Sequence, residues 1–171
     1  MGGADIKRAI EAATGYLELH PDEARYTDRV ASASLVDGLV VRVTGPGGES
    51  VSTDMSTSVG GTDSAPSPGW LLRAAEASCV ATFIAMRAAM LDVTLDTLEV
   101  TVDSVSDDRG ILGIDETVPA GPLSSRVSIR IQAAGVEPST LAEIAHWGVV
   151  HCPVCDAIGR AVPIATEVVT T

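Results

Sequence analysis

The stretch SPGWLLRAAEASCVATFIAMRAAMLDVTLDTLEVTVDS, residues 67–104, contains the pattern that decides the fold. Apolar side chains recur every three or four residues from Trp70 to Leu91, which predicts a long helix. Alanine fills most of the remaining positions, so this helix is apolar nearly all round and is expected to be buried at the centre of the molecule. Strict alternation of apolar and polar residues then predicts a strand from Leu98 to Ser104.

Patterns on either side of this stretch complete the expected order of elements. Helical spacing predicts an N-terminal helix that ends near His20 and Pro21, and the dipeptide Asp37-Gly38 predicts the turn of a hairpin. Runs of strands and helices that are segregated along the chain favour an α+β fold with antiparallel sheets. The remaining expected elements are strands in residues 49–55, 124–133 and 162–169, helices in residues 138–150 and 152–160, and an acidic insertion in residues 105–123.

Length and charge limit the classes of function. The 171 residues suit one main domain, expected in residues 23–171, preceded by a helical extension in residues 1–22. A formal net charge of -12 argues against nucleic acid and anionic membranes as partners. Residues 1–20 lack the apolar run of a signal peptide, and no stretch approaches the roughly 18–20 apolar residues of a membrane span. We therefore expect a cytoplasmic protein.

The motif HCPVCD, residues 151–156, places two of the chain's three cysteines three positions apart. The spacing of Cys152 and Cys155 suits a pair of zinc ligands, but no second pair is present to complete a structural site. The other residues that could supply zinc ligands are Cys79, His146 and His151. A thioredoxin-like exchange site is also disfavoured, because such a motif follows a strand in a βαβ unit and this one follows a predicted helix.

A third interpretation pairs Cys79 with Cys152 across space. Attack on a peroxide needs a thiolate, and Cys79 lies too far inside its helix for the helix dipole to stabilise one. A nearby cation would have to do so, and a second cysteine would then condense with the sulfenic acid. The alternative is that Cys79 is a small buried residue of a packed helix.

The sequence around Cys79 together with HCPVCDAI resembles the OsmC/Ohr family of thiol-dependent peroxidases, over roughly residues 28–169. The resemblance implies cysteine-based reduction of organic hydroperoxides or hydrogen peroxide. It assigns Cys79 as the peroxidatic cysteine and Cys152 as the resolving cysteine that joins it in a disulfide. It further implies an OsmC-like intertwined homodimer, a lipoamide-like dithiol reductant, and no metal or organic cofactor.

Two positions depart from the family pattern. The peroxidases carry a glutamate ten residues before the peroxidatic cysteine, where this chain has Gly69. Glu76 is the nearest carboxylate and would raise the thiol pKa, unless it is exposed or paired with arginine. Cys155 replaces a serine common in relatives, either as an accessory resolving thiol or as a small substitution. The arginine expected to stabilise the thiolate is Arg29, with Arg25 as the second match.

An apolar substrate pocket would be lined by Trp70 and Phe83, although core packing explains both residues equally well. Two other functions fit the same sequence. One is a non-catalytic OsmC-like protein that binds an apolar ligand, which the missing glutamate favours. The other is a redox-sensing or zinc-binding protein that uses the HCPVC motif. Metal content and peroxide turnover would distinguish these functions from a peroxidase.

Overall fold

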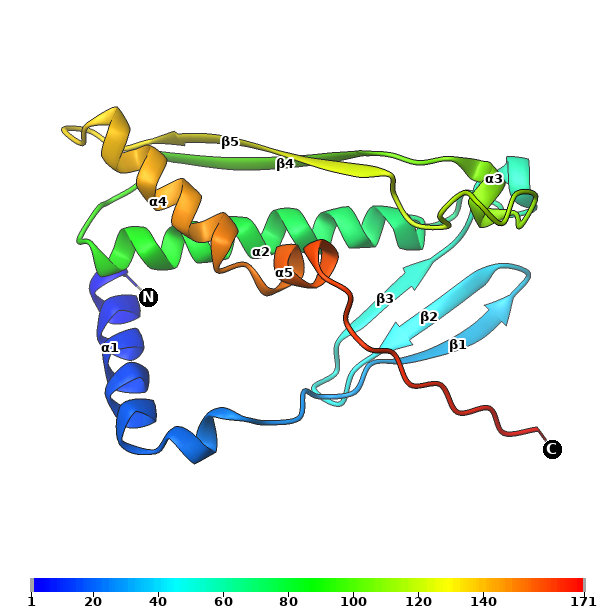
Figure 1. Cartoon of the computed structure of the whole chain (residues 1–171), viewed down its shortest axis with the longest axis horizontal. Coiled ribbons are helices and arrows are strands. Elements are labelled where there is room, and N and C mark those ends of the chain that lie inside the picture. The colour runs from blue at the N-terminus through cyan, green and yellow to red at the C-terminus, as the bar shows by residue number, and fades with distance from the viewer. Residues whose placement is uncertain (1, 171) are drawn as a thin grey trace. The chain divides into compact units, whose positions relative to one another are not determined.

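The computed structural model of the chain describes residues 2–170 (Figure 1). Two compact units divide the chain, which we call the hairpin unit (Arg8–Ala75) and the cysteine unit (Met1–Lys7 with Glu76–Thr171). The mixed helices and antiparallel sheets confirm the α+β class. In chain order the elements are α1 (Gly3–Leu19), η1 (Pro21–Ala24), β1 (Ser32–Asp37), β2 (Val40–Thr44), β3 (Ser50–Thr53), η2 (Thr57–Val59), α2 (Pro68–Met90), β4 (Thr97–Val105), α3 (Asp108–Ile111), β5 (Ser124–Gln132), α4 (Pro138–Val150) and α5 (Pro153–Gly159).

Three antiparallel strands form the sheet of the hairpin unit, in the order β1–β2–β3. The turn between β1 and β2 includes Gly38, whose φ of 53° lies in the left-handed region that glycine adopts without a steric penalty. The register shifts between Leu35 and Asp37, so β1 is irregular just before this turn. The structure thus confirms the predicted hairpin and the third strand that follows it.

The sheet of the cysteine unit is the antiparallel pair of β4 and β5, which aligns nine residues of each strand. The alternation in both sequences gives this pair one apolar face and one polar face. The polar face is exposed and carries the ion pairs Arg126–Asp103 and Arg130–Glu99 between the strands. Five side chains of the apolar face pack against the core of the unit: Leu98, Val100, Val127, Ile129 and Ile131.

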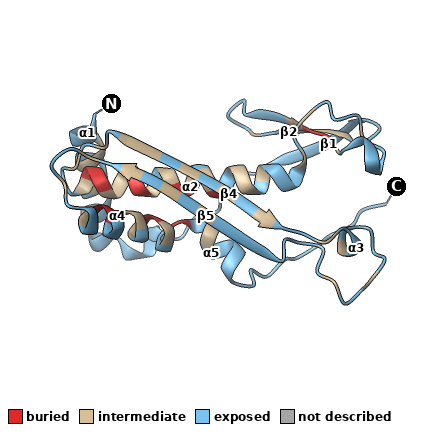
Figure 2. Cartoon of the chain, turned by 90° about the horizontal axis from the view of Figure 1, so that it is seen from above, coloured by how far each residue is buried: buried red, intermediate tan, exposed pale blue. Residues whose placement is uncertain are grey.

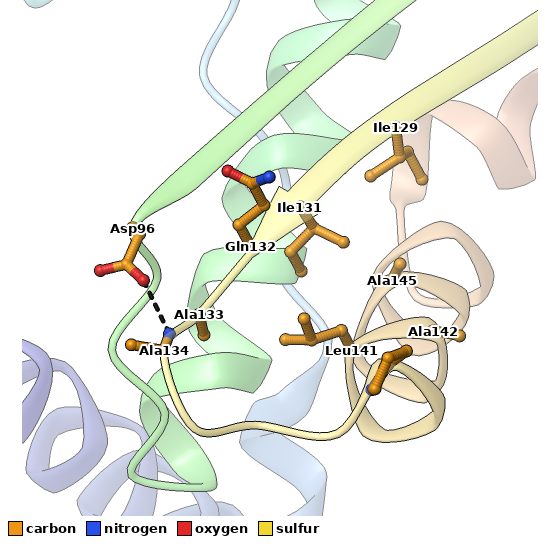
Figure 3. A pocket seen from close by; sticks show the side chains of 10 residues that line it. Asp96, Ile129, Ile131, Gln132, Ala133, Ala134, Leu141, Ala142 and Ala145 are labelled. Atoms are coloured by element: carbon orange, nitrogen blue, oxygen red, sulfur yellow. Dashed lines mark hydrogen bonds between the residues drawn. The ribbon is translucent and has the colours of Figure 1, made fainter.

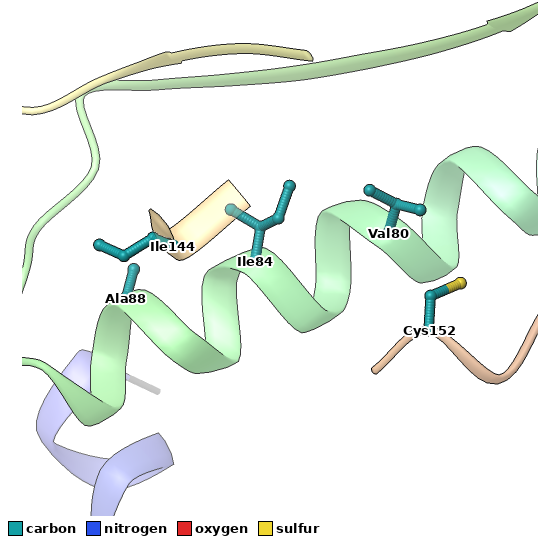
Figure 4. Close-up of a cluster of buried hydrophobic side chains, with 5 residues drawn as sticks. All are labelled: Val80, Ile84, Ala88, Ile144 and Cys152. Atoms are coloured by element: carbon teal, nitrogen blue, oxygen red, sulfur yellow. The ribbon is translucent and has the colours of Figure 1, made fainter. Parts of the chain in front are cut away.

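The core of the cysteine unit forms where α2, α4 and the start of α5 meet. Its central side chains, drawn in Figure 4, are Val80, Ile84, Ala88, Ile144 and Cys152. Figure 2 shows the buried residues of this unit along α2 and α4. The two helices are in close contact at Gly148, where an added Cβ would lie 2.4 Å from Cγ1 of Ile84. Glycine at this position therefore sets the distance between α2 and α4.

Helix α2 is less buried than its sequence predicts. One face is covered, whereas Trp70 and Leu72 are exposed. Alanine has the highest intrinsic helix propensity and is favourable on exposed helix faces too, so a high alanine content does not by itself mean burial. The buried residues of α2 are Glu76, Val80, Ile84, Ala88 and Ala89.

The expectation that no stretch of the chain is long and apolar enough to span a membrane was also too strict. By length and composition alone, α2 would qualify to cross a membrane. Its middle nevertheless carries the buried carboxylate of Glu76, which accepts a hydrogen bond from the Ser125 hydroxyl of β5. A helix that packs against a strand of its own domain is typical of a folded core, and we treat α2 as such a helix.

The strand predicted in residues 162–169 is wrong. This segment forms no strand, and its apolar side chains Val162, Ile164, Val168 and Val169 are exposed. Enrichment in β-branched residues describes how well side chains fit a pleated, half-buried surface, and it produces a strand only beside a neighbouring strand. Within the described residues, this segment has no strand partner.

Candidate thiol site

Cys79 on α2 packs against the core cluster that contains Cys152, which precedes α5, and the Cys152 side chain is close enough to raise the pKa of the Cys79 thiol. The backbone N–H of Val154 acts in the opposite direction and lowers the pKa of Cys79. Cys152 is completely buried, whereas Cys79 is partly exposed, and all three cysteines are free thiols. A sulfenic acid formed on Cys79 would thus lie beside the sulfur of Cys152.

The tight turn between α4 and α5 positions Cys152. Its N–H donates to the carbonyl of Val149 at 3.3 Å, which ties it to the last turn of α4. Pro153 follows at the first position of α5, where a missing N–H leaves no helical hydrogen bond unmade. The Cys152 sulfur caps α5 by accepting the N–H of Cys155 at 3.2 Å.

Glu76 lies in this cluster, one helical turn before Cys79. Only 5% of the residue is exposed, and its Oε2 accepts a hydrogen bond from Ser125 at 2.8 Å. Its Oε1 accepts the thiol of Cys155 at 3.9 Å between sulfur and oxygen. The expectation that Glu76 is exposed or paired with arginine is therefore wrong, because its partners are a hydroxyl and a thiol.

Electrostatics disfavour ionisation of the two partly exposed thiols. Burial raises the pKa of Cys79, its contacts with Cys152 raise it further, and the Val154 N–H opposes this shift. Burial, Cys152 and the negative charge of Glu76 raise the pKa of Cys155 to about 12. Within the described residues, no positive charge contributes to either pKa. Cys79 therefore needs a cation nearby before it becomes a good nucleophile.

Arg29 and Arg25, the sequence candidates for this cation, both lie in the hairpin unit and are exposed. Arg29 borders a pocket of about 300 Å³ beside β2 and β3. Gly69, which stands where the family glutamate is expected, is in the first turn of α2. A Cβ added there would have Arg73 Nη1 at 3.9 Å. Position 69 thus has room for a side chain, and Arg73 lies close enough to contact one.

The two candidates for the substrate pocket have different surroundings. Trp70 belongs to the hairpin unit, where it lines a pocket of about 480 Å³ together with Asp54 and Arg73. Phe83 belongs to the cysteine unit and packs against Trp147, with ring centroids 6.4 Å apart. Core packing therefore accounts for the position of Phe83.

The histidine of the HCPVC motif is engaged in packing. His151 stacks on Trp147 with ring centroids 4.0 Å apart, and its Nδ1 is 2.9 Å from the Trp147 carbonyl. The guanidinium of Arg87 lies over the Trp147 ring, 5.2 Å from its centroid. Across residues 2–170, no three His, Cys, Asp or Glu side chains are arranged to hold a metal ion.

The cysteine unit also has a pocket that is separate from the thiols. It has a volume of about 640 Å³ and lies between the end of β5 and α4, as Figure 3 shows. Its lining is mainly apolar, including Ile129, Ile131 and Leu141. At its edge the carboxylate of Asp96 accepts the N–H of Ala134 at 2.7 Å. Sequence reasoning missed this pocket, because it forms only when a strand and a helix pack together.

Comparison with known families agrees with this architecture. Residues 61–167 match the family described as OsmC-like protein, so the chain belongs to the OsmC-like family. The matched segment includes the three cysteines, Glu76 and Ser125, whereas Arg29 and Arg25 precede it. No curated protein sequence shows a significant match.

Solved structures of the same fold are distant in sequence. An OsmC-like protein from Mycoplasma pneumoniae has 12% identity and a TM-score of 0.66, with 79% of this chain and 89% of that chain covered. An organic hydroperoxide resistance protein, OsmC, from Legionella pneumophila has 18% identity and a TM-score of 0.58, with 78% and 90% covered. An OsmC-like protein of unknown function from Vibrio cholerae has 11% identity and a TM-score of 0.65, with 77% and 94% covered. These similarities show the OsmC/Ohr fold.

Proposed function

We propose that the protein is a thiol-dependent peroxidase that reduces organic hydroperoxides or hydrogen peroxide with Cys79. The observation that carries this proposal is the packing of Cys79 against the buried cluster that contains Cys152. Among its structural relatives, the protein from Legionella pneumophila is described as an organic hydroperoxide resistance protein. Both observations are explained by a redox reaction with peroxides.

The reaction starts with the Cys79 thiolate, which attacks the terminal oxygen of the peroxide. The O–O bond breaks, an alcohol or water leaves after protonation, and Cys79 becomes a sulfenic acid. The Cys152 sulfur then attacks the Cys79 sulfur, an S–S bond forms, and the hydroxyl leaves as water. A small dithiol of the lipoamide type reduces the disulfide to two thiols and becomes oxidised itself. No metal or organic cofactor enters this scheme.

The positive charge for the thiolate is assigned to Arg29, with Arg25 as the alternative. Burial raises the pKa of Cys79, so a guanidinium beside its sulfur would favour the ionised form and the charge that develops during attack. Trp70 and Phe83 remain candidates to contact the organic part of a hydroperoxide. The site residues in this scheme are Cys79, Cys152, Arg29 and, as accessory groups, Cys155, Glu76 and Arg25.

A homodimer is proposed as the working form. The strands and turns of the hairpin unit carry exposed apolar side chains, which a second copy of the chain would cover. The exposed apolar residues of its strands and turns are Leu35, Val36, Leu39 and Val51. We further propose a cytoplasmic location, and a division into a helical extension, residues 1–22, and an OsmC-like domain, residues 23–171.

The test is a titration of the reduced protein with one equivalent of cumene hydroperoxide, followed by mass mapping of disulfides. A disulfide that contains Cys79, formed as the peroxide is consumed, supports the proposal. Cys79→Ser is expected to abolish turnover, and Cys152→Ser is expected to leave a Cys79 sulfenic acid that dimedone traps. Three free thiols with intact peroxide would rule out the peroxidase.

A second candidate function is binding of an apolar ligand without catalysis. The observation that favours it is the largely apolar pocket between β5 and α4, together with Gly69 at the position of the family glutamate. Pockets of about 300–1,000 Å³ are typical of small-molecule sites. In this case the same titration would leave the peroxide unreduced, while an apolar fluorescent probe would bind to the protein. The Leu141→Trp substitution, which places a larger side chain in the pocket lining, would weaken the binding of the probe.

A further inference from the structure

The third thiol has contacts that the peroxidase scheme does not use. The N–H of Cys155 is 3.2 Å from the Cys152 sulfur, and its thiol donates to the buried carboxylate of Glu76. The other oxygen of this carboxylate accepts the Ser125 hydroxyl, so Glu76 is held from two elements. A thiol and a carboxylate thus lie next to the resolving cysteine in a largely buried cluster.

We propose that Cys155 is a second resolving thiol, with Glu76 as its base, which transfers the disulfide from Cys79–Cys152 to Cys152–Cys155. The inference rests on the proposed function, because peroxide reduction supplies the first disulfide. Cys155 gives its proton to Glu76, and its sulfur attacks the Cys152 sulfur. The Cys79–Cys152 bond breaks and Cys79 leaves as a thiolate, which takes up a proton from the solvent, while Glu76 releases to the solvent the proton that it accepted. The transfer exchanges one disulfide for another, so it needs no further oxidant or reductant.

The geometry of the first turn of α5 permits the new bond. With a radius of about 2.3 Å and a rise of about 1.5 Å per residue, an α-helix places Cα atoms three residues apart at about 5 Å, and disulfides bridge Cα atoms about 4.4–6.8 Å apart. The contact between the Cys155 N–H and the Cys152 sulfur already closes this turn. A rotation about the Cα–Cβ bonds of Cys152 and Cys155 is then sufficient to join the sulfurs without moving α2.

Glu76 has the position required of the base. The thiol of Cys155 is protonated at neutral pH because burial and its neighbours raise its pKa to about 12. Its attack therefore requires an acceptor for the proton, and Glu76 Oε1 already accepts its S–H. Ser125 holds the opposite oxygen at 2.8 Å, which fixes the orientation of the carboxylate.

The transfer has two chemical consequences. Cys152 is completely buried, whereas Cys155, like Cys79, is partly exposed, so an external dithiol can still reach one sulfur of the transferred disulfide. Cys79 also becomes a free thiol again and is able to react with a second peroxide. The wild type should therefore consume two equivalents of peroxide per chain before the dithiol is added, and Cys155→Ser should consume one.

The experiment has two arms. In the first, Cys79→Ser is treated with diamide, which oxidises neighbouring dithiols without peroxide, and disulfides are mapped by mass. A Cys152–Cys155 bond is expected; its absence overturns the inference even if the peroxidase is real. In the second, the wild type is mixed with one equivalent of cumene hydroperoxide and quenched with acid over time. The Cys79–Cys152 disulfide is expected first and Cys152–Cys155 afterwards.

The variants separate transfer from peroxide chemistry. In Cys155→Ser the first disulfide should persist. In Glu76→Gln, which keeps the shape of the side chain, the ratio of the transfer rate to the first rate should fall at least tenfold. A merely structural role of Glu76 would slow both steps alike and would overturn its assignment as base. Persistence of Cys79–Cys152 in the wild type would overturn the transfer, whereas a protein that forms no Cys79 product with peroxide would overturn the proposed function.

Discussion

Replacement of Gly148 by alanine is expected to destabilise the cysteine unit by forcing α4 away from α2. The new Cβ would lie 2.4 Å from Ile84 Cγ1 and 2.9 Å from Ile84 N. A rotamer change could move the side-chain atom, but the backbone nitrogen can move only with its helix. Ordinary contact begins at 3.4 Å, and the difference 3.4 − 2.9 = 0.5 Å is the least separation that α4 must gain.

Two opposing effects set the size of the change. Overpacking a well-packed core costs typically about 1–3 kcal/mol, and the higher helix propensity of alanine returns about 1 kcal/mol. Ile84 is completely buried and its backbone is the obstacle, so a net loss of about 1–2 kcal/mol is expected. For a chain of this length, that corresponds to a fall in Tm of about 2–8 °C.

The assay is thermal unfolding followed by circular dichroism, with Gly159→Ala as the matched control. Gly159 ends α5 in the same unit, and an added Cβ there meets nothing within 4 Å. The control should melt within about 1–2 °C of the wild type. The displaced α4 also carries Cys152 through the hydrogen bond to Val149, so Gly148→Ala should form the Cys79–Cys152 disulfide several-fold more slowly. A Gly148→Ala protein that melts at or above the wild type would refute the packing argument.

Two further predictions concern charge. Arg29→Ala should slow the reaction of Cys79 with peroxide about a hundredfold at pH 7, and the rate of this variant should rise about tenfold per pH unit as the thiolate forms. The control Arg126→Ala removes only an exposed ion pair and should leave the rate unchanged. Equal stopped-flow rates in both variants would remove Arg29 from the site. Asp54→Asn should lower the Tm at pH 7, because hydrogen bonds from the 55–64 segment hold the pKa of Asp54 below its ordinary value. Because the pKa of Asp54 is lowered in the folded state, its ionised form stabilises the protein above the ordinary pKa of about 3.9, and this stabilisation is lost as the pH falls. The Tm values of the wild type and of Asp54→Asn should therefore converge below pH 4. A Tm difference that grew on acidification would contradict this.

Periodicity was sufficient to predict most of the fold. A helix or strand that contacts the core with one face has apolar residues at a regular spacing. This spacing predicted the helix in residues 138–150 and the strands on either side of the acidic insertion. The strand in residues 162–169 could not be judged in this way. A strand requires a partner, and no local pattern states whether one is available.

The pairing of Cys79 with Cys152 was predicted from a family resemblance, since no property of either segment alone brings them together. The environment of Glu76 was not predictable at all. A single carboxylate in an alanine-rich helix is usually an exposed residue, and its partner Ser125 is 49 positions away on β5. Only the packing of β5 against α2 decides that this carboxylate is buried.

The placement of Glu76 argues that the cluster is more than a peroxidase site with a spare thiol. Burying a carboxylate is unfavourable unless its hydrogen-bonding capacity is used, and the same charge opposes ionisation of Cys155. A cluster selected only to keep Cys79 reactive would gain from a neutral residue at position 76. The carboxylate becomes useful when a protonated thiol beside it must lose its proton during attack, which is the situation of Cys155 next to an oxidised Cys152. The arrangement therefore favours a site in which all three cysteines take part in thiol–disulfide exchange.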